Sequence, residues 1–393
     1  MEAAIDPRPP PRRRRRKRQK GTRDYTNTAA TTISELPDHI RSNIISRLPL
    51  KSIFTCKRVC SSFRSLTLDP YFPQLHLPMS PLSLILYRHC SSYSHHPTFG
   101  FLSLADSLVD LGLPRSTMKF ETKIEIPACS TLRMKSSCNG LICLSNYYCS
   151  DEVCICNPIT RQHLFLPKPK NKHVWSGYGI GYSQSTHHFK VVKFTVEGEL
   201  PHRLQCWVYT LGVDDEWRSL GDTGQPVPDN GSFVLLNGAL HWIGLQDSEL
   251  LLCYFDMEKE QCGNLPLPNL SFMPCQLKGT RFHLGVVDFC LYIRDEQKCR
   301  LPVNIWVMKD YKNIGSWSLE WIIQRPIPSW VGLDLKPLKT LEDGAVLMIV
   351  KQKTLVSYNP VTTIFERVRY HGVHSWEEAI ADVPSFLPLP GAE

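Results

Sequence analysis

The sequence predicts a mainly β protein, in which a β-propeller of about five to seven four-stranded blades follows a small N-terminal α module and a disordered basic arm. Short runs rich in Val, Ile, Tyr, Trp and Phe, bounded by Gly, Pro, Asn and Asp, recur from about residue 80 to residue 390. A strand–turn–strand unit repeats along them. A helical period of apolar residues is confined to residues 33–70. We therefore expect three parts: a disordered arm over 1–30, a helical module over 31–75 and a propeller over 76–390.

The arm over residues 1–30 has no apolar periodicity, which predicts disorder. Residues 1–23 hold ten positive and two negative side chains, a net +8 that equals the formal charge of the whole chain. The rest of the chain is therefore neutral overall and gives no electrostatic reason to bind nucleic acid. The basic run is of the kind that nuclear import receptors read, so we expect a nuclear and cytoplasmic location. Its residues are Arg12, Arg13, Arg14, Arg15, Arg16, Lys17 and Arg18.

The module over residues 31–75 begins at Leu36-Pro37, where proline fits the start of a helix because no backbone donor is lost there. Ile40, Ile44 and Leu48 then recur every four residues, and Pro49 is expected to end this helix. Two further short helices are expected before Asp69-Pro70, since a residue before proline avoids the helical region. Three short helices cannot enclose a stable core alone, so their apolar side chains need a partner or the following domain.

The β region contains a weak internal repeat of strand, polar turn and strand. Three of the turns fall at Asn157, Asp256 and Asn359, which are 99 and 103 residues apart. Two further units, from Trp207 and from Ile305, lie between them. The period is then roughly 45–55 residues, the length of one four-stranded propeller blade. Residues 80–130 are expected to supply another blade.

The helical stretch resembles the F-box family over about 40 residues. Leu36-Pro37 and the run from Leu48 to Ser52 match its Leu-Pro and Leu-Pro-x-Lys-Ser segments, and the run from Lys57 to Arg64 matches Lys-x-Val-Cys-Lys-x-Trp-Arg. Phe63 stands where the family usually has Trp, which keeps the aromatic bulk but removes the indole donor. Ser61 replaces a common Lys. The resemblance implies contact with a Skp-type adaptor, and through it a cullin, by Leu36, Pro37, Ile40, Ile44, Leu48, Pro49, Leu50, Val59, Cys60 and Phe63.

The β region resembles the F-box-associated domain of plant F-box proteins, which implies a kelch-like propeller that receives the substrate. Three segments carry the resemblance: 136–144 (SSCNGLICL), 155–167 (ICNPITRQHLFLP) and 237–244 (NGALHWIG). Their Asn-Gly and Asn-Pro pairs are interpreted as turns between strands, so these motifs are expected to be architectural.

Together the two resemblances imply the substrate-recognition subunit of a Skp–cullin–F-box (SCF) E3 ubiquitin ligase. Such a subunit promotes ubiquitination by holding its target near the ligase and needs no catalytic residue. The target and the residues that bind it are not identified by the sequence. The alternative is a nuclear interaction scaffold that acts outside ubiquitin ligation.

Other function classes find less support in the residues. Cys143, Cys149, Cys154 and Cys156 lack the two matched pairs of a structural zinc site, and no secretory signal or membrane-spanning run is found. A Gly-x-Ser-x-Gly elbow, a phosphate-binding loop and a His-Glu-x-x-His motif are all absent, so we expect no cofactor, no metal and no enzyme activity. A propeller hydrolase and a nucleic-acid binder acting through the arginine arm are the remaining alternatives.

Overall fold

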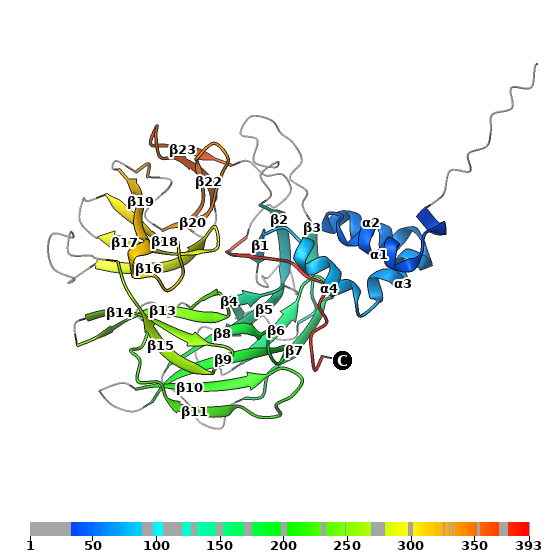
Figure 1. Ribbon diagram of the computed structural model, residues 1–393, viewed down its shortest axis with the longest axis horizontal. Coiled ribbons are helices and arrows are strands. Elements are labelled where there is room, and N and C mark those ends of the chain that lie inside the picture. The colour runs from blue at the N-terminus through cyan, green and yellow to red at the C-terminus, as the bar shows by residue number, and fades with distance from the viewer. Residues whose placement is uncertain are drawn as a thin grey trace, which may run out of the picture.

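In the computed structural model, a group of short helices lies beside a ring of six four-stranded sheets (Figure 1). The blade number falls within the range expected from the repeat. Among the described residues, no helix is long and apolar enough to cross a membrane. The structure describes residues 33–88, 97–104, 120–126, 132–146, 152–168, 175–197, 203–228, 233–247, 249–268, 280–297, 302–324, 327–329, 331, 334–351, 354–368 and 376–392.

The helical module contains α1 (Asp38–Ser46), α2 (Leu50–Val59), α3 (Ser61–Leu68) and α4 (Phe72–His76), flanked by the 3₁₀ turns η1 (Ile33–Glu35) and η2 (Leu77–Met79). Pro37 and Pro49 each stand directly before a helix, in the same extended conformation. The first helix therefore ends at Ser46, before Pro49, and that proline opens the second helix instead of closing the first. The sequence predicted three helices, and α4 is an addition: Phe72 is fully buried and Pro73 fits the first turn of a helix.

Each blade is a four-stranded antiparallel sheet. The first contains β24 (Glu378–Asp382), β1 (Ser83–Arg88), β2 (Thr98–Ser103) and β3 (Phe120–Lys123), and the second β4 (Leu132–Cys138), β5 (Leu141–Asn146), β6 (Val153–Asn157) and β7 (Gln162–Phe165). The third contains β8 (Trp175–Ser183), β9 (His188–Glu197), β10 (Arg203–Thr210) and β11 (Arg218–Asp222), and the fourth β12 (Val234–Leu236), β13 (Ala239–Gln246), β14 (Glu249–Asp256) and β15 (Gln261–Leu265). The fifth contains β16 (Thr280–Val287), β17 (Cys290–Gln297), β18 (Val303–Met308) and β19 (Trp317–Ile323), and the sixth β20 (Leu335–Thr340), β21 (Val346–Val350), β22 (Thr354–Asn359) and β23 (Ile364–Arg367).

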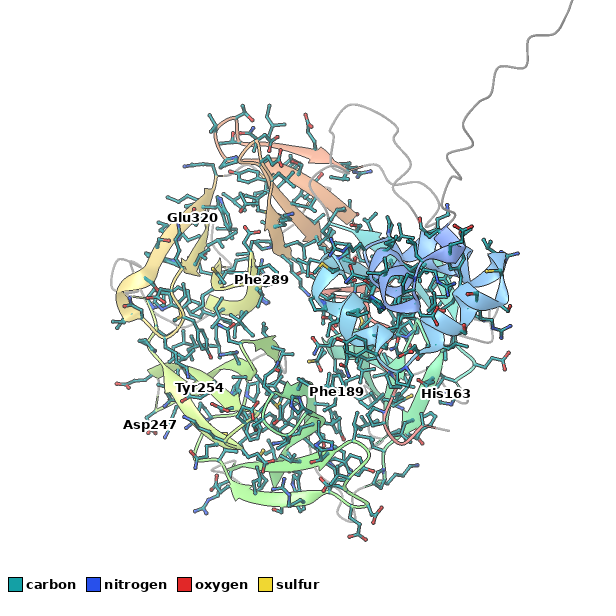
Figure 2. The ribbon with its side chains drawn as sticks, turned by 45° about the vertical axis from the view of Figure 1, so that its right-hand side comes forward. His163, Phe189, Asp247, Tyr254, Phe289 and Glu320 are labelled. Carbon is teal, nitrogen blue, oxygen red and sulfur yellow. The ribbon has the colours of Figure 1, made fainter. Side chains whose placement is uncertain are left out.

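The ring closes by pairing the two ends of the β region. Strand β24 comes from the C-terminus and runs antiparallel to β1, with Ser83 opposite Asp382 and Tyr87 opposite Glu378. Strands β24, β4, β8, β12, β16 and β20 each stand at one end of their sheet and contact one another in that order. The blades form a ring around a central opening (Figure 2). Apolar clusters fill the spaces between neighbouring blades, for example Phe194 and Trp242 between the third and fourth. Because the first blade needs β24, removal of the C-terminus would open the ring.

One turn recurs between the third and fourth strands of three blades, and it explains the internal repeat of the sequence. In each turn a side-chain oxygen accepts hydrogen bonds from backbone N–H groups two and three residues further on. Asn157 accepts from Ile159 and Thr160, Asp256 from Glu258 and Lys259, and Asn359 from Val361 and Thr362. These side chains mimic a backbone turn, which is why Asn or Asp stands at each of the three positions.

Tight two-residue turns join the first and second strands of the second, fourth and fifth blades. Asn139-Gly140 and Asn237-Gly238 have positive φ at both positions, which is the conformation that this dipeptide favours. Asp288-Phe289 has the same conformation in the fifth blade, at φ 48° and 58°. A bulky aromatic residue is strained there, and the Phe289 side chain is 71% exposed beside the central opening (Figure 2). No sequence pattern predicts this turn, because Asp-Phe is not a tight-turn dipeptide.

Tryptophan side chains link neighbouring blades by a recurring hydrogen bond. The indole N–H of Trp217, just before β11, donates to the carbonyl of Pro167 in the preceding blade at 2.7 Å. Trp317 at the start of β19 donates to Pro266 in the same way at 2.9 Å. Both prolines follow a leucine that ends or succeeds the outer strand of its blade. The Leu-Pro pair of the repeat therefore acts as the acceptor that joins one blade to the next.

Candidate adaptor-binding surface

Helix α1 turns two of the predicted adaptor contacts towards solvent. Ile40 and Ile44 lie one turn apart on the same side of the helix and are 40% and 38% exposed. The neighbouring Ile45 points the other way and is 1% exposed, in the core of the module. Helix α1 thus buries one isoleucine and exposes two to solvent. The exposed side chains of Ile40 and Ile44 add little to the stability of the folded chain.

The remaining predicted contacts divide into exposed and half-buried residues. Pro37 and Pro49, at the starts of α1 and α2, and Val59 and Cys60, where α2 meets α3, are exposed. Leu36, Leu48, Leu50 and Phe63 are half-buried, and the last three pack against the core that the helices share with the propeller. Six of the ten predicted residues are therefore open to a partner, while Leu48, Leu50 and Phe63 also help to hold the module together.

A polar contact joins α1 to α3, and Lys57 lies over an aromatic ring within α2. The Arg41 guanidinium in α1 donates to the Ser62 hydroxyl in α3 at 2.5 Å and also pairs with Asp38. Lys57 in α2 lies with its ammonium 5.3 Å from the centre of the Phe54 ring. Burial, and then repulsion by Arg64, lower the pKa of Lys57. The helix that presents Ile40 and Ile44 is thus tied to α3.

The motif residues of the propeller are architectural, as the sequence predicted. Asn157 is fully buried in its turn, and the indole N–H of Trp242 donates to the Pro226 carbonyl at 2.9 Å. His241 is also fully buried, and its Nε2 lies 2.8 Å from the Tyr311 hydroxyl of the next blade. Burial lowers the pKa of His241 to about 4, so this side chain is neutral near pH 7. None of these groups is open to a ligand from solvent.

The cysteines and acidic residues of the described chain form no site for a metal. No group of three or more His, Cys, Asp or Glu side chains among those residues could hold a metal ion. Cys154 and Cys156 are buried on the same face of β6, and burial raises the pKa of the Cys154 thiol to about 12. The acidic Asp214-Asp215-Glu216 segment lies in the turn between β10 and β11, at the surface.

Short helices with exposed apolar side chains, placed beside a β-propeller, define a protein of two parts, a helical module and a propeller. Residues 92–388 match the family of the F-box associated beta propeller domain, and residues 33–75 match the F-box domain. The first match spans most of the chain. The chain belongs to the F-box-associated propeller family of plant F-box proteins.

Three relatives from Arabidopsis thaliana match this chain along most of their own length. An F-box protein is 26% identical over 88% of this chain and 89% of its own length. A second F-box protein is 27% identical over 72% of this chain and 77% of its own length. An F-box/kelch-repeat protein is 24% identical over 86% of this chain and 91% of its own length. The similarity to the first and third of these therefore extends over both the helical and the propeller part.

The sequence did not reveal the role of the segment after β24. Residues 383–392 run from the centre of the ring past the second blade, and the C-terminus lies near β7 (Figure 1). Phe386 in this segment is 5% exposed and packs among the helices. The only local signal is the presence of Phe386, Leu387 and Leu389 in a proline-rich stretch.

The basic run Arg12–Arg18 lies outside the described residues.

Proposed function

We propose that the protein is the substrate-recognition subunit of an SCF ubiquitin ligase. The helical module binds a Skp-type adaptor, which links it to a cullin, and the propeller binds a protein target. The exposure of Ile40, Ile44 and Val59 is the observation that carries the proposal, because these apolar side chains belong to the F-box motif and no part of the described chain buries them. Burying them against a partner removes apolar surface from water and favours association.

The proposed role needs no catalytic residue. The ligase assembly brings a ubiquitin-loaded enzyme near the target, and the receptor acts by raising the local concentration of one reactant beside the other. The relatives support this view, because they are F-box proteins, one of them with kelch repeats, that align with this chain over most of their own length.

The target-binding residues are expected on one face of the ring. In the second to sixth blades the turns after the first and third strands lie at the same edge of the sheet, because all four strands are antiparallel. That edge of the second blade is occupied by residues 385–387, which bond to Asn139 and Asn157. We therefore place the protein target on the opposite face. Loops carried on a rigid scaffold are the usual site of specificity.

Replacing Ile40 and Ile44 with Glu tests the adaptor contact. Each isoleucine is already partly exposed, so the change should leave the fold intact while it places charge in the interface. Loss of two buried isoleucines is worth about 3 kcal/mol, which weakens binding by about 100-fold or more. The measurement is titration of the purified protein with a purified Skp-type adaptor. Gln74→Glu, an exposed substitution on α4, is the matched control.

Binding by the double variant at the affinity of the control would contradict the adaptor contact. A second test addresses ligase activity. A receptor's targets should accumulate when the Ile40→Glu, Ile44→Glu variant replaces the normal protein, and proteasome inhibition should have the same effect with the normal protein. Targets that bind the propeller but whose levels respond to neither treatment would favour a scaffold outside ubiquitin ligation.

We also propose that the basic run directs the protein to the nucleus, in addition to a cytoplasmic pool. Seven consecutive basic residues, Arg12–Arg18, support this proposal through their charge. Replacing them with Ala in a fluorescent fusion should move the nuclear fraction to the cytoplasm. An unchanged distribution would refute it.

A further inference from the structure

We propose that the C-terminal segment 383–392 is a strap that completes the adaptor-binding module and fixes its orientation on the propeller, with Phe386 as the positioning residue. The contacts of this segment do not depend on the proposed function. Only their consequence, the placement of the adaptor relative to the target, rests on it. The contacts of the strap are independent of any partner.

The aromatic ring of Phe386 lies within the helical module. Its centre is 5.8 Å from that of Phe54 in α2, 5.5 Å from that of Phe72 in α4, and 5.0 Å from that of His76. The ammonium of Lys57 lies 4.7 Å from the centre of the same ring. Helices α2 and α4 therefore meet on a side chain that the C-terminus of the chain supplies.

Four short helices have little core of their own, so one additional buried ring matters. The fully or nearly buried apolar side chains from the helices are Ile45, Ile53, Leu66 and Phe72, and they belong to one cluster with Phe386 and with residues of the first two blades. A module of this size buries too little surface to be stable alone. Phe386 is therefore part of the core of the F-box and not an attachment to its surface.

The residues on either side of Phe386 are fastened to the second blade. The Asn157 amide donates two hydrogen bonds, to the carbonyls of Ser385 at 3.1 Å and Leu387 at 2.7 Å. The Ser385 hydroxyl donates to the carbonyl of Asn139. A Cβ atom at Gly140 would lie 2.5 Å from the backbone nitrogen of Ser385, so the close approach of the strap requires glycine there.

The two ends of the strap are also fixed. At its start, the Ser80 hydroxyl, just after the helical module, donates to the carbonyl of Pro384 at 3.0 Å. At its end, Leu389 is 1% exposed in the cluster between the second and third blades, and its N–H donates to the Gln162 side chain at 3.0 Å. Because the segment is held at both ends and in the middle, the position of Phe386 is fixed relative to the propeller.

The consequence is a fixed angle between the adaptor-binding helices and the propeller. Apolar side chains of the first two blades pack in the same cluster as the helices, and Phe386 adds a contact that comes from the C-terminal segment. With Phe386 inserted between α2 and α4, a shift of the helices relative to the second blade must break the packing around this ring. The strap therefore sets where a bound target lies relative to the adaptor.

Phe386→Ala is the direct test, with Phe386→Leu as the conservative variant. Hydrogen–deuterium exchange of the full-length protein without any partner gives the first measurement. We expect the slowest amides of α2 and α4 to exchange at least about 100-fold faster in Phe386→Ala, with a smaller increase in Phe386→Leu. Exchange in the third to fifth blades should not change. Phe282→Ala removes a comparably buried ring between the fourth and fifth blades and should give the converse pattern.

Small-angle scattering of the complex with a Skp-type adaptor gives the second measurement. The Phe386→Ala complex should have a broader distribution of interatomic distances than the wild-type complex. Unchanged exchange of α2 and α4 in Phe386→Ala would overturn the strap, and so would unfolding of the whole propeller, since Phe386 would then be a general core residue. If the wild-type protein fails to bind the adaptor, the proposed function is refuted, while the exchange data still decide whether the strap exists.

Discussion

Asn157 provides the sharpest test of how the C-terminal segment is attached to the second blade, because Asp256 occupies the equivalent position in the fourth blade. Asn157 and Asp256 occupy the same position in the same turn, and both accept the two backbone hydrogen bonds that form it. Of the two, Asn157 alone also uses amide N–H groups, which donate to Ser385 and Leu387. The substitution Asn157→Asp keeps the shape and the acceptor but replaces these donors with a carboxylate oxygen.

The expected cost follows from the burial of the site. Asn157 is fully buried, so two carbonyl groups would lose their donors and face a negative charge. A buried polar group left without its partner costs about 1–3 kcal/mol, so two of them predict a loss of about 4 kcal/mol. Asp256→Asn, in contrast, keeps the turn and should change stability by less than about 0.5 kcal/mol.

The assay is urea denaturation of both variants and of the wild type, followed by tryptophan fluorescence and by far-UV circular dichroism. The pH adds a second criterion, because protonation of the carboxyl group introduced by Asn157→Asp would restore one donor. The deficit of this variant relative to the wild type should therefore be smaller at pH 5 than at pH 8. Equal stability of the Asn157→Asp and Asp256→Asn variants would refute the claim that the second blade holds the C-terminal strap through this amide.

Two further predictions concern a strained turn and a buried imidazole. Phe289→Gly should stabilise the protein by about 0.5–1 kcal/mol, because a left-handed backbone conformation costs a bulky residue more free energy than it costs glycine and little buried surface is lost. Thermal unfolding measures the change, and a lower midpoint than that of the wild type would contradict it. Burial lowers the pKa of His76 to about 4, below its ordinary value of 6.5, so its contribution to stability is present above pH 6.5 and is lost as the pH falls towards 4. Between pH 7 and pH 5 this loss is about 2 kcal/mol, and His76→Gln should remove that part of the pH dependence in urea titrations at both pH values. An identical pH dependence in wild type and variant would contradict this, because it would show that the pKa of His76 is the same in the folded and the unfolded chain.

The structure also shows how a propeller family can keep a weak sequence repeat. The residues that recur are those that make turns and blade-to-blade hydrogen bonds: Asn or Asp at the turn, Leu-Pro after the outer strand, and Trp217 or Trp317 in the next blade. The strand residues themselves vary, because apolar side chains of similar volume can fill the same space. The sequence repeat can therefore be recognised at the turns, while the strands between them show little similarity.

Local chemistry determined what the sequence could predict. Proline at 37 starts a helix, Asn-Gly at 139 and 237 makes tight turns, and Asn157, Asp256 and Asn359 mark the repeated hairpins, since each of these acts within a few residues of itself. The helical period and the regular spacing of the hairpins were enough for the fold class, whereas the F-box was predicted from the resemblance of its motifs to that family. The same period indicated that Ile40 and Ile44 share one side of a helix.

Contacts between distant parts of the chain decided the rest. The closure of the first blade by β24 joins residues 83 and 382, and the insertion of Phe386 between α2 and α4 joins parts of the chain more than 300 residues apart. Neither has a local signature, because a strand or a phenylalanine has the same sequence pattern whichever neighbour it packs against. Whether an apolar side chain lies inside the fold or is left for a partner depends on what the rest of the chain brings to it, and only the tertiary structure shows Ile45 covered and Ile44 open.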